Sequence, residues 1–120
     1  MDLSSMIQEM KQHPLYPEMG MIASHLGVVR ATSLNGEPVT AVEVDFDQKE
    51  IARIADQTKK MPGIIHVLIE TAGPGRLAVG DDIMAVVVAG DTRDHVFPAL
   101  VDIVNRIKER GARKREIFAI

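Results

Sequence analysis

Two runs of mostly apolar, β-branched residues constrain the fold of this chain more than any other feature. They read GIIHVLIET at residues 63–71 and DIMAVVVAG at residues 82–90. Both have the length of a β-strand, and Val and Ile pack well on a pleated surface. Because few polar residues interrupt them, we expect central strands that are covered, at least in part, on both faces.

The segment that joins these runs is rich in glycine but is not expected to bind a nucleotide. It reads AGPGRLAVGDD at residues 72–82. A phosphate-binding glycine loop must open a helix, whose free N–H groups meet the phosphates. This segment leads from one strand to another, so we interpret it as a hairpin connection.

Helical spacing of apolar residues predicts three helices. Ser4 or Ser5 is expected to cap the first, which runs to about residue 13. The second begins at Asp47, which has capping-box spacing to Glu50, and continues to about residue 60.

The third helix is predicted from an N-cap at Asp94 to Arg110, with Gly111 as the residue that follows its end. Pro98 would then occupy the fourth helical position, where its missing N–H had no partner within the helix.

Three further strands are predicted, at residues 20–30, 39–46 and 115–120. The Asn35-Gly36 pair is a strong turn signal and predicts that the first two form a hairpin. With about three helices and five strands, the chain is an α+β protein, mostly antiparallel. Its 120 residues are enough for one domain, residues 1–120.

Composition excludes several classes of function. A net charge of −3 argues against general affinity for nucleic acid, and only four aromatic residues leave few platforms for base stacking. The absence of cysteine excludes disulfides, Cys-ligated metals and thiol catalysis. No segment has the features of a signal peptide or a membrane span, so we expect a cytoplasmic protein without membrane contact.

The four histidines do not indicate a metal site, because His13, His25, His66 and His95 have no metal-ligand spacing. We expect no metal and no cofactor. His66 lies inside an apolar run and is interpreted as a half-buried strand residue.

Two segments are candidates for binding anions. GDTRDH, residues 90–95, lies between a strand and a helix, where Arg93 and free N–H groups favour an anion; alternatively, its polar residues simply cap the helix. The second is RIKERGARKR, residues 106–115, which holds six of the fourteen Lys and Arg residues. These charges either complement the helix dipole or form a pocket for an acidic partner or a phosphorylated ligand.

In order and spacing, four segments resemble the large, catalytic subunit of molybdopterin synthase. GVVR (27–30) is similar to the family's Gly-x-Val-Arg strand end, and GRLAVGDD (75–82) to its Gly-x-Leu-x-x-Gly-Asp/Glu hairpin. TRDHVFPAL (92–100) stands where the family has His-Arg, and RIKERGARKRE (106–116) resembles the segment with two lysines. The resemblance covers residues 20–116 and implies an α/β hammerhead-like fold.

The resemblance implies roles for six residues. Lys108 and Lys114 match the active-site lysines, and Arg30 matches an arginine that binds anionic groups of the pterin. Arg93 is implied to reach the same pocket from the neighbouring protomer of a homodimer. Thr92 replaces the family's histidine beside it, and His25 replaces an aromatic residue of the pocket, so both are expected to contact substrate. Arg106, Arg110 and Arg113 are expected to remain solvated helix-end charges.

The implied activity is in molybdenum cofactor biosynthesis. A thiocarboxylated ubiquitin-like sulfur carrier, the small subunit, would donate sulfur to cyclic pyranopterin monophosphate and give molybdopterin. An alternative is a divergent, non-catalytic relative that binds a sulfur carrier or a pterin as an interaction or regulatory module. A third is an unrelated function, such as weak binding of nucleic acid or an acidic protein by the basic segment.

Overall fold

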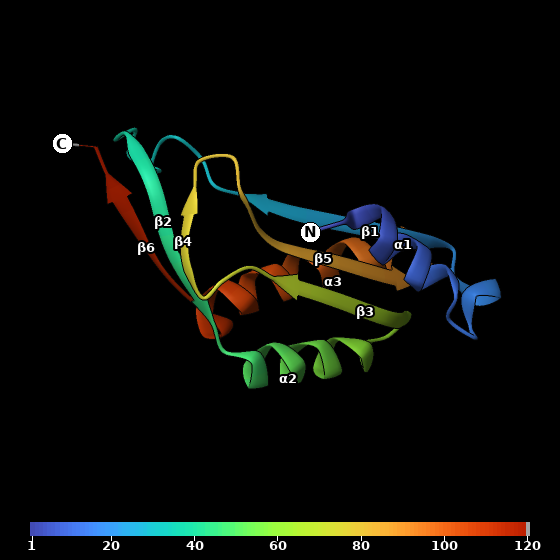
Figure 1. Cartoon of the computed structure of the whole chain (residues 1–120). Coiled ribbons are helices and arrows are strands. Elements are labelled where there is room, and N and C mark those ends of the chain that lie inside the picture. Colours follow the sequence, from blue (N-terminus) through green and yellow to red (C-terminus); the bar gives the residue numbers. More distant parts are fainter. Residues whose placement is uncertain (120) are drawn as a thin grey trace.

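The two apolar runs form neighbouring antiparallel strands in a computed structural model of the chain, which describes residues 1–119. They are β3 (Ile64–Thr71) and β5 (Asp82–Gly90), and β1 (Met21–Val28) pairs with the other edge of β5. The first sheet therefore has the order β1-β5-β3 (Figure 1). The prediction of a central strand is confirmed for β5, which is buried from Met84 onward, but it is wrong for β3, which is an edge strand.

A second antiparallel sheet has the order β4-β2-β6. Its central strand is β2 (Val39–Phe46), and its edges are β4 (Gly75–Ala78) and β6 (Ala112–Phe118). The glycine-rich segment does connect the hairpin of β3 and β5, as predicted. It also contains β4, which was not predicted and which carries the connection across to pair with β2.

The turn at Asn35-Gly36 forms, with one antiparallel bridge between Thr32 and Pro38, but the predicted pairing of the two long strands does not. Gly36 has a φ of 83°, and the Ser33 hydroxyl oxygen accepts the N–H groups of Asn35 and Glu37. However, β1 and β2 belong to different sheets, since β1 pairs along its whole length with β5. The turn itself was predicted correctly, but β1 pairs with β5, which is far from it in sequence, instead of with β2.

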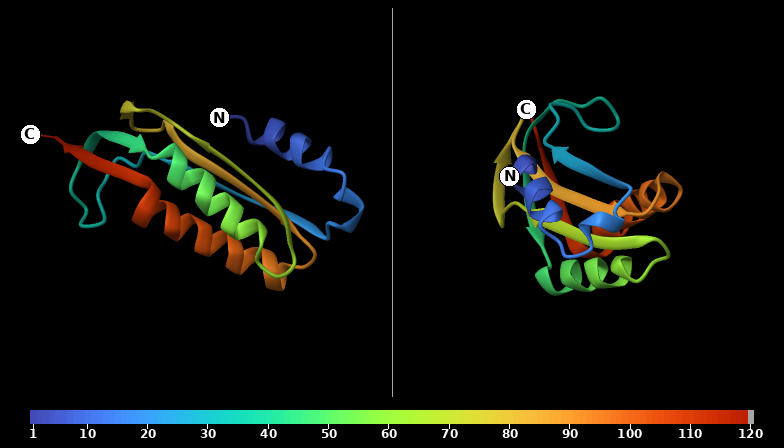
Figure 2. Two further views of the ribbon diagram at one scale, coloured as in Figure 1. Left: turned by 90° about the horizontal axis from the view of Figure 1, so that it is seen from below. Right: turned by 90° about the vertical axis from the view of Figure 1, so that its right-hand side faces the viewer.

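Helices cover both faces of the first sheet (Figure 2). Helix α1 (Leu3–Lys11) lies on one face, and α2 (Gln48–Lys59) and α3 (Arg93–Arg106) lie side by side on the other. A short 3-10 helix, η1 (Tyr16–Glu18), follows α1. Within residues 1–119, no helix is long and apolar enough to cross a membrane.

The helix caps follow the predictions in one case of three. Asp47 caps α2 as predicted, since its carboxylate accepts the N–H groups of Lys49 and Glu50. For α1 the predicted serine cap is wrong: Asp2 is the N-cap, and its carboxylate accepts both the N–H and the hydroxyl of Ser5. The carboxylate of Asp2 thus accepts the helix N–H group that a serine hydroxyl was expected to accept.

Helix α3 differs from the prediction at both ends. Its N-cap is Thr92, not Asp94, so Pro98 lies inside the helix. Asp94 and Pro98 are both exposed, so water can reach the Asp94 carbonyl that the proline leaves unpaired. The α-helix ends at Arg106 and continues as one π turn, η2 (Ile107–Gly111), that leads into β6.

One apolar core joins the two sheets. Side chains of the inner face of the second sheet, Val42, Val44 and Phe46, belong to the same buried cluster as Val86 and Ile103 of the first layer. The junction of the sheets is therefore fixed by packing on both sides, and it is there that a cavity opens.

Candidate functional site

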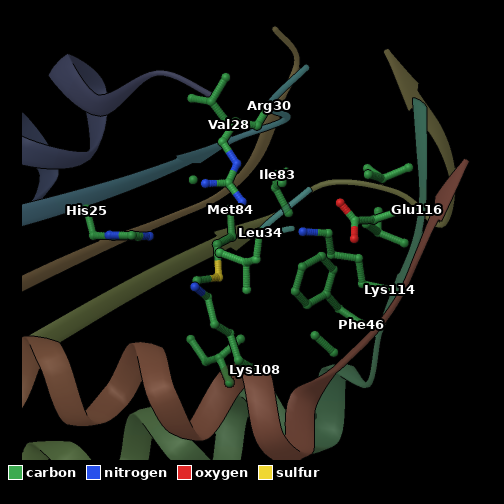
Figure 3. Close-up of a pocket in the computed structure, with 15 residues that line it drawn as sticks. His25, Val28, Arg30, Leu34, Phe46, Ile83, Met84, Lys108, Lys114 and Glu116 are labelled. Carbon is green, nitrogen blue, oxygen red and sulfur yellow. The ribbon is translucent and has the colours of Figure 1, made fainter. Parts of the chain in front are cut away.

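A cavity of about 590 Å³ lies where the two sheets meet (Figure 3). Strands β1 and β5 form one wall, β2 and β6 form another, and the turn η2 closes the base. The residues that line it are His25, Gly27, Val28, Arg30, Leu34, Val42, Val44, Phe46, Ile83, Met84, Ile107, Lys108, Ala112, Lys114 and Glu116. Four of the six predicted site residues are in this set.

Strand alternation explains why only some of the basic C-terminal side chains enter the cavity. In β6, Lys114 and Glu116 line the cavity, whereas Arg113 and Arg115 lie on the opposite face. Lys108 reaches the cavity from η2, and Arg30 reaches it from the residues that follow β1 (Figure 3). Three cationic side chains from three separate parts of the chain thus converge on one space.

His25 adds a titratable group beside Lys108. Burial lowers the pKa of His25, and the nearby Lys108 charge lowers it further. The imidazole is therefore neutral at pH 7, when it can donate or accept a hydrogen bond.

The rest of the lining is apolar. Phe46, Ile83 and Met84 contribute apolar walls, and Leu34, at the turn that follows β1, also lines the cavity although it is 90% exposed. Apolar walls lower the local dielectric constant, which strengthens the attraction of the cations for an anion. The cavity suits a ligand with anionic groups and an apolar or flat body.

Glu116 was missed in the sequence, although it lines the cavity. The signal was present, because Glu116 lies two residues after Lys114 and therefore on the same face of β6. Its carboxylate is the one acidic group among the lining residues, and its negative charge is opposite in sign to the charges of Lys108, Lys114 and Arg30.

The structure does not bring Thr92 and Arg93 to the cavity of the same chain. They begin α3 at the end of the first sheet where Met21 pairs with Gly90, whereas the cavity lies at the Val28 end. Their roles as substrate contacts stay predictions.

The polar residues of GDTRDH do not cap α3 with their side chains, since Thr92 is the N-cap and makes no side-chain cap hydrogen bond. One carboxylate oxygen of Asp91 accepts the N–H of Thr92 at 2.6 Å and lies 2.7 Å from Nδ1 of His95. The hydrogen bond to His95 lowers the pKa of Asp91. The Asp91 carboxylate therefore bonds to the residues around the helix start and not to the first N–H groups of the helix.

Two further histidines, His13 and His66, lie against each other and do not line the cavity. His66 is half-buried, as predicted, and its ring lies 4.7 Å from the ring of His13, centroid to centroid. Among residues 1–119, no group of three or more His, Asp or Glu side chains is arranged to hold a metal ion.

On the outer face of the second sheet, Glu43 lies between two arginines. Its carboxylate is 3.3 Å from Arg76 and 2.7 Å from Arg115, which are its cross-strand neighbours in β4 and β6. Hydrogen bonds from Arg115 and then Arg76 lower the pKa of Glu43. These two arginines are therefore engaged away from the cavity.

Residues 1–110 match a protein family described as MoaE protein. A search of curated protein sequences finds no match. Several solved structures share the fold, which confirms the α+β architecture, and three of them are described below.

The X-ray crystal structure of molybdopterin synthase from Staphylococcus aureus has a TM-score of 0.77 and 22% identity, and the alignment covers 98% of this chain and 86% of that one. Molybdopterin cofactor biosynthesis protein E from Burkholderia multivorans has a TM-score of 0.76 and 25% identity, with 99% and 85% covered. A complex of subunits 1 and 2 of molybdopterin-converting factor from Helicobacter pylori has a TM-score of 0.70 and 14% identity. The alignment covers 99% of this chain and 84% of that one.

Proposed function

Since the chain belongs to the MoaE protein family, its role is in molybdenum cofactor biosynthesis, and we propose that it is the catalytic, large subunit of a molybdopterin synthase. In this proposal it transfers sulfur from a thiocarboxylated ubiquitin-like carrier to cyclic pyranopterin monophosphate, and the product is molybdopterin. One observation carries the proposal: Arg30, Lys108 and Lys114 converge on a single, otherwise mostly apolar cavity.

The cavity has the charges that this reaction requires. The substrate brings a phosphate and the carrier brings a thiocarboxylate, so two anionic groups must approach each other. Lys108 and Lys114 can neutralise both and stabilise the negative charge that develops during sulfur transfer, while Arg30 binds the phosphate or another anionic group of the pterin. Neutral His25 can hydrogen-bond to the pterin ring without adding a fourth cation.

Lys114 lies outside the part of the chain that matches the family, which ends at residue 110. Its place in the proposal rests on geometry: Lys114 pairs with Val44 across the second sheet and lines the cavity together with Lys108. The wide turn between them lets two lysines six positions apart serve one space.

The proposed partner is a small subunit of the ubiquitin-like carrier type. The Helicobacter pylori structure is of a complex between two subunits, and its fold matches this chain over 99% of its length. We propose that the carrier's C-terminal tail enters at Val28 and Leu34, which are exposed beside the cavity.

A homodimer would explain how Arg93 and Thr92 take part. Strand β1 is at the edge of its sheet, and apolar side chains are exposed on it (Leu26) and on α3 (Phe97, Val101). Antiparallel pairing of β1 with its copy about a two-fold axis would place the Met21 end of one protomer beside the Val28 end of the other. Arg93 and Thr92 lie near the first end and the cavity near the second, so each protomer could complete its partner's site.

The proposed reaction is cytoplasmic. A non-catalytic relative is not favoured, because the three cations of the cavity are all present.

Reconstitution tests the proposal. The protein is mixed with thiocarboxylated carrier and cyclic pyranopterin monophosphate, and the dithiolene product is measured. We expect turnover that falls by about 100-fold or more in Lys108→Ala, the usual range when a charge-stabilising group is lost. The matched control is Lys49→Ala, which removes an exposed lysine at the start of α2. Carrier binding without product in the unmodified protein would contradict the proposal.

A further inference from the structure

Arg106, the last residue of α3, turns its side chain onto α2 and not into solvent. The side chain is only 16% exposed. Its guanidinium donates to Oε1 of Gln57 at 3.1 Å and to Oγ1 of Thr58 at 3.4 Å. It also donates to Asp102 on its own helix, from Nε at 3.0 Å and from Nη2. The prediction that Arg106 is a solvated charge is therefore wrong, because it joins α3 to the last turn of α2.

Gly111, five residues later, joins the chain to the first turn of α2. It is buried, and a Cβ atom there would lie 2.9 Å from Cδ1 of Ile51. Its carbonyl oxygen accepts the N–H of Asp47, the cap of α2, at 2.8 Å. The prediction that Gly111 follows the end of the helix is wrong, because Gly111 is the last residue of the π turn η2 (Ile107–Gly111). A side chain at this position would require the end of the Ile51 side chain to move.

Between these two attachments lies the π turn η2, Ile107–Gly111. Ile107 and Gly111 face the core, whereas the three residues between them are exposed. One of these is Lys108, which extends from the turn into the cavity (Figure 3). Single π turns are rare and are frequently found at functional sites. This one is attached to α2 on both sides, by Arg106 and by Gly111.

We propose that Arg106 is a positioning residue, which clamps η2 to α2 so that the amine of Lys108 is held in the cavity. Helix α2 contributes no side chain to the cavity lining, so its influence on the site passes through this turn. An arginine suits the task because its planar fork binds three acceptors on two helices at once, which a lysine cannot do. The kinetic consequence rests on the proposed function, whereas the clamp itself does not.

The first experiment tests the clamp without any substrate. Backbone hydrogen exchange is compared in the unmodified protein, in Arg106→Met and in Arg53→Met, a control that removes an exposed arginine paired with Glu50 on the surface of α2. We expect amides of residues 107–112 to exchange about tenfold faster or more in Arg106→Met only, because local opening becomes easier. Equal exchange in the two variants would overturn the inference.

The second experiment separates positioning from general stability. In the reconstituted reaction, Arg106→Met should lower kcat by about 10- to 100-fold, the usual cost of a small displacement of a reacting group. Arg106→Lys should restore part of that rate. Adding Arg106→Met to Lys108→Ala should cause no further loss, because the residue that Arg106 positions is already absent.

Additive losses in the double variant would overturn the inference, since they would mean that Arg106 acts independently of Lys108. If the unmodified protein makes no product, the proposed function fails, and the exchange experiment still decides whether Arg106 clamps the turn.

Discussion

The two sheets of this protein differ in how they are covered. The first, β1-β5-β3, has helices on both faces, and its central strand is buried from Met84 to Gly90. The second, β4-β2-β6, packs one face on the core and exposes the other, which carries Glu43 between its two arginines. The first sheet is thus covered like the central sheet of an α/β protein, whereas the second sheet has one face in solvent.

Because of this difference, the residues that stabilise the fold and the charged residues that line the cavity are largely distinct. The central strand of the first sheet carries no charged side chain from Met84 to Gly90, because burying an unpaired charge between two layers of helices is costly. The second sheet can present Lys114 and Glu116 to a cavity while Val42 and Val44 of the neighbouring strand pack on the core. We therefore expect substitutions of buried first-layer residues that lie away from the cavity to change the free energy of unfolding. Substitutions of charged residues that line the cavity should instead change binding and turnover.

The largest expected loss of stability is at Met10, which is fully buried between α1 and the first sheet and is remote from the cavity. Met10→Ala should lower the free energy of unfolding by about 2–5 kcal/mol, because it leaves a cavity in a packed interior. Chemical denaturation measures this, with Met10→Leu as a control of similar volume. The comparison of the sheets would be weakened if Met10→Ala altered carrier binding more than stability.

A smaller loss of stability is expected at Asp47. This residue follows β2 directly and caps α2, so it lies between the two layers. Asp47→Ala removes the acceptor for two N–H groups and should cost about 0.5–2 kcal/mol. Asp56→Ala, on the exposed side of the same helix, is the control and should cost less. Equal losses in the two variants would show that the cap is unimportant.

The smallest effect is expected from His66 of β3, and it depends on pH. Burial, then the charge of Lys59 and then His13, lower the pKa of His66, so the folded state binds a proton less readily than the unfolded state. Stability is therefore complete above the ordinary pKa of 6.5 and falls as pH decreases through the folded-state value. Thermal unfolding between pH 7 and pH 5 should show a shallower decline in His66→Gln. An unchanged decline would contradict this.

Much of the fold could be predicted because its signals are local. Alternation at Val42, Val44 and Phe46 identified β2, and the side chain of Asp47 identified the start of α2. Strand pairing is not local, so the turn at Asn35-Gly36 could not reveal that its two strands enter different sheets. Strand β4 was hidden because its four residues form a strand only by pairing with β2.

The candidate site shows the same limit. Lys108, Lys114, Arg30 and His25 were named from a resemblance, and the structure brings them to one cavity, although their roles stay proposals. Arg106 was misinterpreted because a basic residue at a helix end is usually solvated, and its contacts to α2 are with residues nearly fifty positions earlier.

Two neighbouring residues of β6 test the central claim most directly, because Lys114 faces the cavity and Arg115 faces the outer surface, where it pairs with Glu43. Each is changed to alanine, and dithiolene product is measured per folded molecule in the reconstituted reaction. Lys114→Ala should lower turnover by about 100-fold or more, as expected for a group that stabilises developing charge, whereas Arg115→Ala should leave it within about twofold because exposed ion pairs contribute little. Equal losses in the two variants would contradict the assignment of Lys114 to the chemistry of the cavity.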